Sequence, residues 1–566
     1  MTVVAGTGRR VAALLPTLAD WTAVRRQPRR DVLAGLTVAI VALPLALGFG
    51  VSSGLGAAAG LATAIVAGAL AAILGGSNLQ VSGPTGAMTV VLVPIVGQFG
   101  AAGVLTVGLI AGVVLIGLAV ARAGRFVQYV PAPVVEGFTI GIAMVIFLQQ
   151  VPAALGVAAV HGDKVAVVAW HAMIDFVATP HWPSLALAAG VAVVMLAGVR
   201  WKPGVPFSLL AVAAATALAV VAGLNVAQIG TLPKTLAAPS LAFLHPSAIP
   251  LLLPSALAVA ALAALESLLS ATVADAMTVG QRHDPDRELF GQGVANLVTP
   301  LFGGVPATAA IARTAVNVRT GAGSRLAALT HAVVLAAVML AAAPLVAHVP
   351  LAALAGVLLA TAIRMVEVSS LLALARSTRS DAVVMGFTAL ATLAFDLVTA
   401  VGIGVVLAAF LAVSKIARAA TLEQVPLDLS DHHAEEAALL REHIVAYRFD
   451  GPLFFAAAHR FLLELSEVSD VRVIILRMSR ISTVDGSGAV VLRDAIERLE
   501  RRGITVYLSG VRTGHTKALE AIGVLDRLRQ CNRVFEHTDE AITAARALLH
   551  NHRVLPQRPN LATEPI

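Results

Sequence analysis

Charged residues are scarce in this chain. Asp, Glu, Lys and Arg make up 13% of its 566 residues, whereas 58% of the residues are hydrophobic. Soluble domains carry roughly 25% charged residues, so this shortage excludes a set of ordinary soluble domains and indicates an integral membrane protein. Cysteine is limited to Cys531, which excludes an intramolecular disulfide framework and fits a cytosolic C-terminus.

The motifs of enzymes and of ATP-driven pumps are also missing. The chain has no G-x-x-x-x-G-K-[ST] phosphate loop, so nothing supports ATP-driven pumping. Its histidines lack metal-ligand spacing, and Gly50–Gly54 matches the hydrolase pattern G-x-S-x-G only between apolar segments. We therefore expect no catalytic residue, no metal and no cofactor, and we do not expect an enzyme.

Apolar segments follow one another with short breaks from Asp31 to about Arg418. We predict about fourteen of them, using the roughly 20 residues that a bilayer-spanning helix needs. They begin near Val32, Leu55, Pro84, Gly103, Pro133, Pro183, Val205, Leu251, Leu289, Pro306, Leu326, Pro350, Asp381 and Leu397.

Basic residues cluster at the ends of these segments, so the net charge of +7 does not indicate nucleic acid as a partner. Counted from a cytoplasmic start, the inner loops hold Arg122, Arg125, Arg200, Lys202, Arg282, Arg287, Arg319, Arg325, Arg376, Arg379, Lys415 and Arg418. The outer loops hold only Lys164 and Lys234. This positive-inside pattern predicts a multi-pass protein of the bacterial inner membrane with both termini in the cytoplasm. The basic stretch of residues 1–30 has no apolar core for a cleavable signal.

Two segments are broken by Gly and Pro, Val81–Met88 and Gly303–Ala310, and their prolines are 306 − 84 = 222 residues apart. The same offset places Pro44 opposite Glu266 (44 + 222 = 266). Short broken segments at matching places in two halves indicate a binding site at the membrane midplane. We infer two inverted repeats of about seven segments each.

The two broken segments predict an anion site. Pro84 and Pro306 suit the first turn of a helix, and two facing helix N-termini would bind an anion through free N–H groups and positive dipole ends. The donors expected there are Thr85, Gly86 and Ala87 on one side and Ala309, Ala310, Ile311 and Ala312 on the other. Arg313 would add positive potential. The alternatives are two kinked helices packed through small residues and a salt bridge from Arg313 to Glu266 or Glu136.

Glu266 follows an apolar run, Leu251–Leu265, that contains no charge. Burial in a low dielectric favours the protonated carboxyl, so Glu266 is a candidate proton carrier; the alternative is a permanently paired carboxylate. Ser270 lies four residues on and could hydrogen-bond Glu266 or an ion. Leu45 and Phe49 would put an apolar edge beside the site, although core packing also explains them.

The composition changes after Arg418. Three β-rich runs, His443–Asp450, Val471–Met478 and Ile504–Ser509, alternate with helical stretches at Ala489–Arg501 and Lys517–Leu525. This alternation predicts a small soluble α/β domain over residues 441–550. We expect residues 419–440 to be a charged linker and residues 551–566 a disordered tail. Ser487, at a helix start in this domain, could bind or accept phosphate or act as an N-cap.

Three stretches carry a family resemblance: ESLLSATVADAM…DRELFGQGVANLV…FGGVPATAAIARTAVN from Glu266, DVLAGLTVAIVALP at Asp31–Pro44, and GPT at Gly83–Thr85. They resemble the sulfate permease (SulP) family of anion transporters, and the C-terminal part looks like its STAS domain. The resemblance covers nearly all of the chain after Asp31. It implies a core-and-gate membrane domain over residues 31–418, elevator-like alternating access and a homodimer. The implied substrates are sulfate, bicarbonate, chloride or dicarboxylates.

Carried over by position, the anion pocket of the family falls on Leu45, Phe49, Thr85–Ala87 and Ala309–Arg313. This chain departs from the family pattern at several positions: many relatives have Gln at Leu45 and Ser at Ala312. Sodium-coupled relatives have Asp and Thr at the positions of Glu266 and Ser270, and a hydroxyl at Ile311. A hard cation needs several oxygens, so Ile311 argues against sodium and favours protons. Ser487 matches a phosphorylated serine of related soluble proteins, but Gly486 departs from their Asp-Ser-Ser pattern.

The sequence thus predicts a secondary active anion transporter, a proton-coupled symporter whose partners are a small anion, protons, membrane lipid and a second copy of the chain. An electroneutral anion exchanger is the first alternative. A nucleobase transporter would be expected to show a second acidic ligand near Arg313, which this segment lacks. A signalling protein anchored by an inert membrane domain is the last. The anion itself cannot be read, because sulfate, bicarbonate and fumarate would bind such donors by the same physics.

Overall fold

The computed structural model describes residues 13–157, 164–202, 205–395, 397–426, 440–456 and 471–552. The first twelve residues, most of the expected linker and nearly all of the expected tail lie outside these ranges. The chain divides into two units, Met1–Ala408 and Ala409–Ile566, and each is described by itself. The boundary falls inside the helix Leu397–Ala419, which is described with the first unit.

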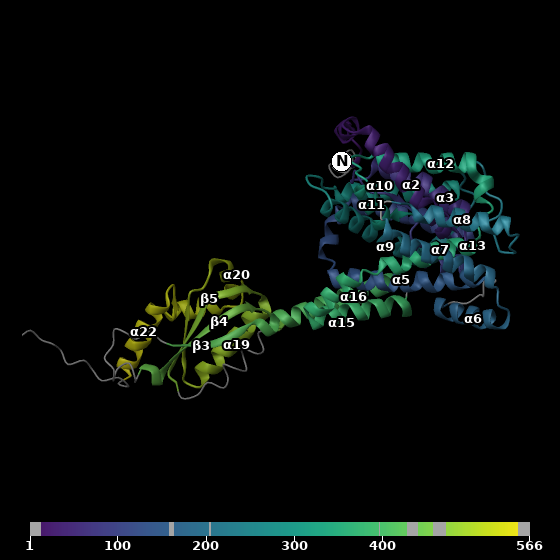
Figure 1. The fold of residues 1–566 in the computed structure, drawn as a ribbon. Helices are drawn as coiled ribbons and strands as arrows, with labels where there is room; N and C mark the ends of the chain where they lie inside the picture. Colours follow the sequence, from purple (N-terminus) through teal and green to yellow (C-terminus); the bar gives the residue numbers. More distant parts are fainter. Residues whose placement is uncertain are drawn as a thin grey trace, which may run out of the picture. The chain divides into compact units, whose positions relative to one another are not determined.

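The first unit is almost entirely helical (Figure 1). Its helices are η1 (Leu18–Arg25), α2 (Pro28–Ser52), α3 (Ala57–Leu74), α4 (Gly86–Val120), η2 (Ala123–Tyr129), α5 (Ala132–Leu155), α6 (Val165–Ala178), α7 (Trp182–Trp201), α8 (Phe207–Val221), η3 (Pro246–Ala248), α9 (Ile249–Ala276), α10 (Pro285–Val298), η4 (Thr299–Phe302), α11 (Ile311–Arg319), α12 (Leu326–Val346), α13 (Leu351–Met365), α14 (Val368–Ser377), α15 (Arg379–Ala394) and α16 (Leu397–Ala419). In the described part of the chain, nine helical spans are long and apolar enough to cross a membrane.

The predicted mostly helical membrane domain is confirmed, and its helix count roughly fits the predicted segments. Each predicted segment corresponds to a helix or to half of one. Two predicted segments share α4, which is interrupted between them at Gly100, where φ is 65°. Two short helices, α6 and α14, were not predicted. The 14 residues of α6 and the 10 of α14 are too few to cross a bilayer.

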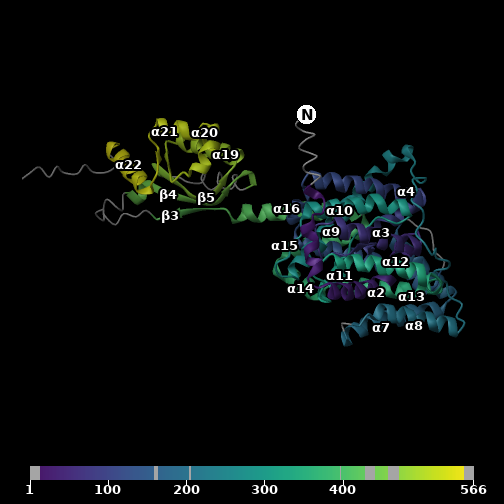
Figure 2. The same ribbon diagram turned by 90° about the horizontal axis from the view of Figure 1, so that it is seen from above.

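The helices of this unit pack in two groups. In one, α2, α3, α4, α9, α10 and α12 contact one another, and in the other α5 contacts α7, α13 and α15. Figure 1 shows most of the first group on one side of α5 and α15, and Figure 2 shows the same helices from above. The groups meet where α13 contacts α2 and α4 contacts α5.

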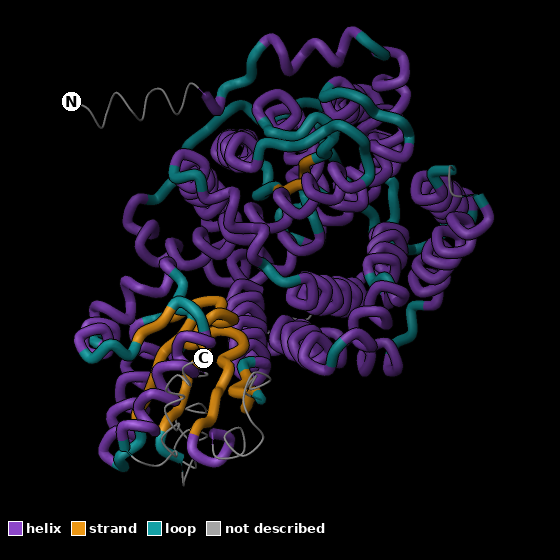
Figure 3. The backbone as a smooth tube through the Cα atoms, turned by 90° about the vertical axis from the view of Figure 1, so that its left-hand side faces the viewer, coloured by secondary structure: helices purple, strands orange, loops and turns teal. Residues whose placement is uncertain are grey.

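Two strands of two residues each cross inside the first group. Strand β1 (Ser82–Gly83) pairs antiparallel with β2 (Thr308–Ala309), Ser82 opposite Ala309 and Gly83 opposite Thr308. Figure 3 shows this pair as a short strand segment enclosed by helices. All four residues are buried. The pairing lets two irregular segments satisfy buried backbone groups, as a low-dielectric interior requires.

The second unit contains a five-stranded sheet in the order β3-β4-β5-β6-β7, with only β3 antiparallel to its neighbour. Its strands are β3 (Thr421–Val425), β4 (Ile444–Leu453), β5 (Val473–Val484), β6 (Thr505–Ser509) and β7 (Val534–Phe535). Its helices are α19 (Gly486–Arg501), α20 (Thr513–Ala521), α21 (Val524–Gln530) and α22 (Thr538–Asn551).

The predicted α/β domain is therefore present, with two corrections. The expected linker contains a strand, β3. This strand was not predicted because its mostly exposed residues lack the apolar alternation by which strands are recognised in a sequence. The stretch predicted as one helix at Lys517–Leu525 is two, α20 and α21, which are separated by Gly523 in a left-handed conformation (φ 77°).

Candidate functional site

The β1–β2 pair brings two helix N-termini to the same place. Helix α4 begins at Gly86 with Thr85 as its N-cap, and α11 begins at Ile311 with Ala310 as its N-cap. The expectation that Pro84 and Pro306 sit in the first turns is wrong. Pro306 precedes β2, which separates it from α11, whereas Pro84 directly follows β1 and lies two residues before the start of α4. Each helix start retains N–H groups that have no partner within its own helix.

Glu266 of α9 lies beside the start of α4. The Thr85 hydroxyl donates a hydrogen bond of 2.9 Å to Glu266 Oε2, and the Thr308 side chain is a second neighbour of this carboxylate. Thr85 also accepts a 3.4 Å hydrogen bond from the Met88 N–H in the first turn of α4. Glu266 is therefore connected to the cap of one helix N-terminus and to the strand that leads to the other.

Arg313 of α11 is 2% exposed, and its Nη2 donates a 2.9 Å hydrogen bond to the carbonyl of Pro84. Its Nη1 has no hydrogen-bond partner among the described residues. Gly83 allows this approach, because a Cβ there would lie 2.7 Å from Nη1. Within the described part of the chain Arg313 forms no ion pair, so neither salt-bridge alternative is found; Glu136 instead accepts a hydrogen bond from Ser370.

The N–H groups near the start of α11 are not all free. Ala309 donates to Ser267 Oγ at 3.2 Å, and Ala310 donates to the Val81 carbonyl at 3.1 Å. The expectation that these two N–H groups face a ligand is therefore corrected. The donors left at this end are those of Ile311, Ala312 and Arg313, which have no partner within the helix. Ile311 is 40% exposed and Ala312 is also exposed, so this turn is accessible.

The start of α4 is covered instead. Gly86 and Ala87 are buried, as are Leu45 and Phe49 of α2. A Cβ on Gly86 would lie 2.2 Å from Ile146 Cδ1 and 3.2 Å from Phe49 Cε1. Ile146 belongs to α5, in the other helix group, and it could not be predicted because it is one of many apolar residues in that helix.

Ser270 does not bond Glu266. Its hydroxyl donates to Thr314 Oγ1 at 3.0 Å, and the same oxygen accepts the Val81 N–H at 3.2 Å. Ser270 thus stabilises the paired strands, and the expected hydrogen bond to Glu266 is not found among the described residues. Ser267, one residue after Glu266, has a comparable structural role that was not predicted: its Oγ lies 3.0 Å from Thr308 Oγ1.

One buried residue near the site was missed entirely. His331 of α12 is fully buried, and neither ring nitrogen has a partner among the described residues. It lies near Arg313, and its Nδ1 is 3.7 Å from where a Cβ of Gly68 would stand. Its neighbours in sequence carry no motif that would have indicated this position.

In the second unit, the N-cap of α19 is Asp485, whose carboxylate accepts the Gly488 N–H at 2.7 Å. Ser487 is exposed in the first turn of the helix. The interpretation of Ser487 as an N-cap is therefore wrong, because the acceptor stands two residues earlier.

Comparison with known proteins identifies the chain. A profile of the sulfate permease family matches residues 29–388, and a STAS domain profile matches residues 437–541. The chain belongs to the sulfate permease family. A Bacillus subtilis (strain 168) protein, YvdB, named as a candidate sulfate transporter, is 33% identical over 90% of this chain and 97% of its own length. The bicarbonate transporter BicA of Picosynechococcus sp. is 30% identical over 89% of this chain and 92% of its own length.

Solved structures agree with this fold. Murine Slc26a9, described as an anion transporter in the inward-facing state, superposes with a TM-score of 0.81 at 18% identity, covering 95% of this chain and 94% of that one. The transmembrane domain of a cyanobacterial BicA gives a TM-score of 0.60 at 29% identity, covering 68% of this chain and 98% of that one. The predicted family and the predicted fold class, a helical membrane domain with a C-terminal STAS domain, are therefore confirmed.

Proposed function

We propose that this protein is a secondary active transporter of a small anion of the sulfate, bicarbonate or C4-dicarboxylate class, working as a proton-coupled symporter. One observation carries the proposal. The buried Arg313 lies in the first turn of α11, whose start is accessible, and the Glu266 carboxylate accepts a hydrogen bond from Thr85, the N-cap of the other helix start. The names of the relatives, sulfate and bicarbonate transporters, support the substrate class.

The anion would be held by the first turn of α11. The N–H groups of Ile311 and Ala312 need an acceptor, and the helix dipole favours a negative charge at that end. Arg313 Nη1, which has no hydrogen-bond partner in the described part of the chain, supplies a further donor, and the guanidinium supplies a full positive charge. The first turn of α4, with Thr85, Gly86 and Ala87, would complete the pocket when Ile146 no longer covers Gly86, and Leu45 and Phe49 would form its apolar edge.

Glu266 would carry the coupling proton. It is the carboxylate that lies close to the Arg313 charge, and its bond to Thr85 connects it to the second helix start. A sodium ion would need several oxygen ligands, and Ile311 supplies no side-chain oxygen at the adjoining position. We extend the proposal to elevator-like movement of one helix group against the other, to a homodimer, and to cytoplasmic termini in a bacterial inner membrane.

The coupling is tested in proteoliposomes with radiolabelled sulfate and bicarbonate as separate substrates. An inward proton gradient should accelerate uptake by the wild-type chain, and Glu266→Gln should abolish the acceleration while anion binding persists. Glu136→Gln is the matched control, because it also removes a carboxylate from the membrane domain but outside the crossing. Acceleration that survives in Glu266→Gln would contradict the proposal. Uptake that requires an anion inside the vesicles and is not accelerated by the proton gradient would establish anion exchange instead.

A further inference from the structure

Helix α10 carries three polar side chains on one face. Glu288, Gln292 and Asn296 are spaced four residues apart, so they line up along the helix. Each is at most 1% exposed, and none was singled out by the sequence analysis. Buried amides and carboxylates are costly unless they are hydrogen-bonded, so their partners indicate what this face does.

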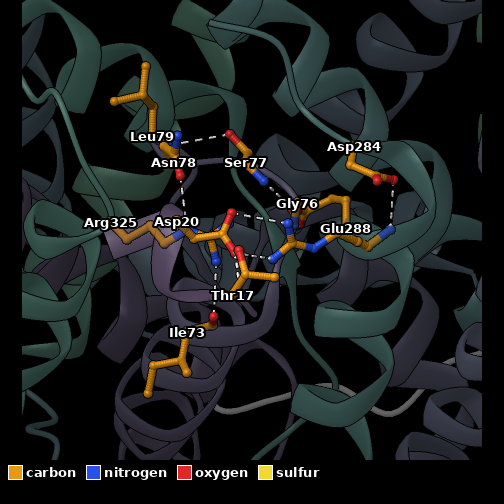
Figure 4. Close-up of polar contacts among 11 residues, drawn as sticks. Thr17, Asp20, Ile73, Gly76, Ser77, Asn78, Leu79, Asp284, Glu288 and Arg325 are labelled. Atoms are coloured by element: carbon orange, nitrogen blue, oxygen red, sulfur yellow. Dashed lines mark hydrogen bonds and ion pairs between the residues drawn. The ribbon is translucent and has the colours of Figure 1, made fainter. Parts of the chain in front are cut away.

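The first two residues hold the segment that leads into α4. Glu288 Oε2 accepts the N–H groups of Gly76 and Ser77 at 2.9 and 3.2 Å, in the loop between α3 and β1 (Figure 4). Gln292 Nε2 donates to the hydroxyl of Ser82 in β1 at 2.6 Å and to Glu288 Oε1 at 2.9 Å. The loop and the strand are thus bound to one helix at consecutive points.

The third residue holds the segment that leads into α11. Asn296 Nδ2 donates to the Ala307 carbonyl, and Asn296 Oδ1 accepts the Ala307 N–H, both at 2.8 Å. Ala307 comes immediately before β2. A single helix face therefore contacts both irregular segments, one from each half of the membrane domain.

Close backbone packing fixes α10 itself. A Cβ on Gly291 would lie 2.5 Å from the Gly75 backbone in the loop after α3, and a Cβ on Gly112 of α4 would lie 2.5 Å from the Leu297 backbone in α10. The backbones therefore pack closely at these glycines, with no room for a side chain between them. The polar face belongs to a helix that is tightly packed against α4 and the loop after α3.

We propose that Glu288, Gln292 and Asn296 are positioning residues that set the spacing between the starts of α4 and α11 and thereby the affinity for the anion. The proposal rests on the proposed function. The link to the site is direct: Ser82 and Gly83 form β1, and the next carbonyl, that of Pro84, holds Arg313 at 2.9 Å. A displacement of β1 therefore displaces the guanidinium relative to the first turn of α11.

The test separates positioning from stability by removing the Gln292–Ser82 pair in stages. Gln292→Met leaves the Ser82 hydroxyl and Glu288 Oε1 without their donor. Gln292→Met with Ser82→Ala leaves no orphaned hydroxyl, although Glu288 Oε1 still lacks its donor, and is expected to recover part of the thermal stability. Full-length proteins would be purified, and their unfolding midpoints and their dissociation constants for sulfate, bicarbonate and fumarate measured. We expect about tenfold weaker binding in both the single and the double variant, because the contact that places β1 is absent from each.

The chain offers a matched control. Gln150 of α5 and Ser52 of α2 form another Gln–Ser pair, which is partly buried and involves neither β1 nor β2. Gln150 Nε2 donates to the Ser52 hydroxyl at 3.1 Å. Gln150→Met, alone and with Ser52→Ala, should change stability but leave the dissociation constant within about twofold of the wild-type value.

Two results would overturn the inference, and they differ from failure of the proposed function. Affinity that recovers together with stability in the double variant would show that the pair is merely structural. Equal loss of affinity in the Gln150 control would show that removing any Gln–Ser pair of the membrane domain weakens anion binding, whichever segments the pair connects. A wild-type chain that binds none of the three anions would refute the proposed function itself, and this inference with it.

Discussion

Replacing Asp20 with Asn should release the N-terminal helix η1 from the helices beneath it. The Asp20 carboxylate accepts hydrogen bonds from Arg287 Nη1 and Nη2 at 3.1 and 2.8 Å and lies 3.8 Å from Arg325 Nη2. Figure 4 shows Arg325 reaching in turn to Asn78 and to the Ile73 carbonyl. Asp20 therefore connects η1 to the start of α10, to the start of α12 and, through Arg325, to the end of α3.

The size of the effect follows from these contacts. A hydrogen bond to a charged group contributes about 1.5–3 kcal/mol, and Asp20 makes two of them to Arg287. The side chains of Arg287 and Asp20 are only 13% and 17% exposed, so solvent screening is limited. Asn keeps one neutral acceptor and loses the charge, so we expect a net loss of about 2–3 kcal/mol. Local opening of η1 should then become about 30- to 140-fold more frequent.

Hydrogen exchange over residues 17–26 measures this opening. The hydrogen bonds from Arg287 hold the pKa of Asp20 well below its ordinary value of 3.8. A carboxylate with a lowered pKa stabilises the fold above that value and loses its effect only as the pH falls through the lowered pKa. Exchange in the wild-type chain, corrected for the intrinsic rate, should therefore be constant between pH 8 and 5.

Glu520→Gln serves as the control, because it breaks an exposed ion pair with Arg529. We expect it to change amide exchange in the helix that contains Glu520 by less than about twofold. A rise below about threefold in Asp20→Asn would refute the reasoning, as would opening of the wild-type segment at pH 5.

Two further predictions concern packing and capping. Gly86→Ala should lower the unfolding midpoint and weaken anion binding, because its Cβ would meet Ile146 Cδ1 at 2.2 Å and overpacking costs about 1–3 kcal/mol. Ile146→Ala in the same chain should restore part of the midpoint, and an unchanged midpoint in Gly86→Ala would contradict the packing. Asp485→Ala should cost about 1 kcal/mol and speed amide exchange in the first turn of α19 about fivefold, because Gly488 loses its acceptor. Ser487→Ala should leave that exchange unchanged, and the reverse sensitivity would make Ser487 the cap.

The fold of the membrane domain was predictable because its signals are local. Apolar runs of bilayer length mark most helices, and Gly and Pro mark the two interruptions that became the β1–β2 crossing. The register of the crossing was not predictable. Aligning Pro84 with Pro306 gave an offset of 222 residues, whereas the two strands begin at Ser82 and Thr308, 308 − 82 = 226 residues apart. A strand of two residues has no periodicity from which its partner could be inferred.

The candidate site was predictable only in part, because several roles depend on contacts between distant segments. Arg313 and Glu266 stood out as charges in apolar surroundings. The direction of the Ser270 hydroxyl, towards Thr314 rather than Glu266, depends on the approach of α11 to α9. Gln292 and Asn296 looked like ordinary polar residues in the sequence. Their partners, Ser82 and Ala307, lie 210 and 11 positions away respectively and become known only from the structure.

The position of Glu266 gives the proposed symport a thermodynamic basis. An ionised Glu266 would partly offset the charge of Arg313 and repel an anion at the α11 turn, and a proton on Glu266 removes both effects. Charges about 5–10 Å apart interact by about 2–3 kcal/mol at an effective dielectric near 20. Proton and anion should therefore strengthen each other's binding, and linkage requires the two factors to be equal. A symporter needs this property, because a carrier that holds both ligands or neither seldom moves one of them alone.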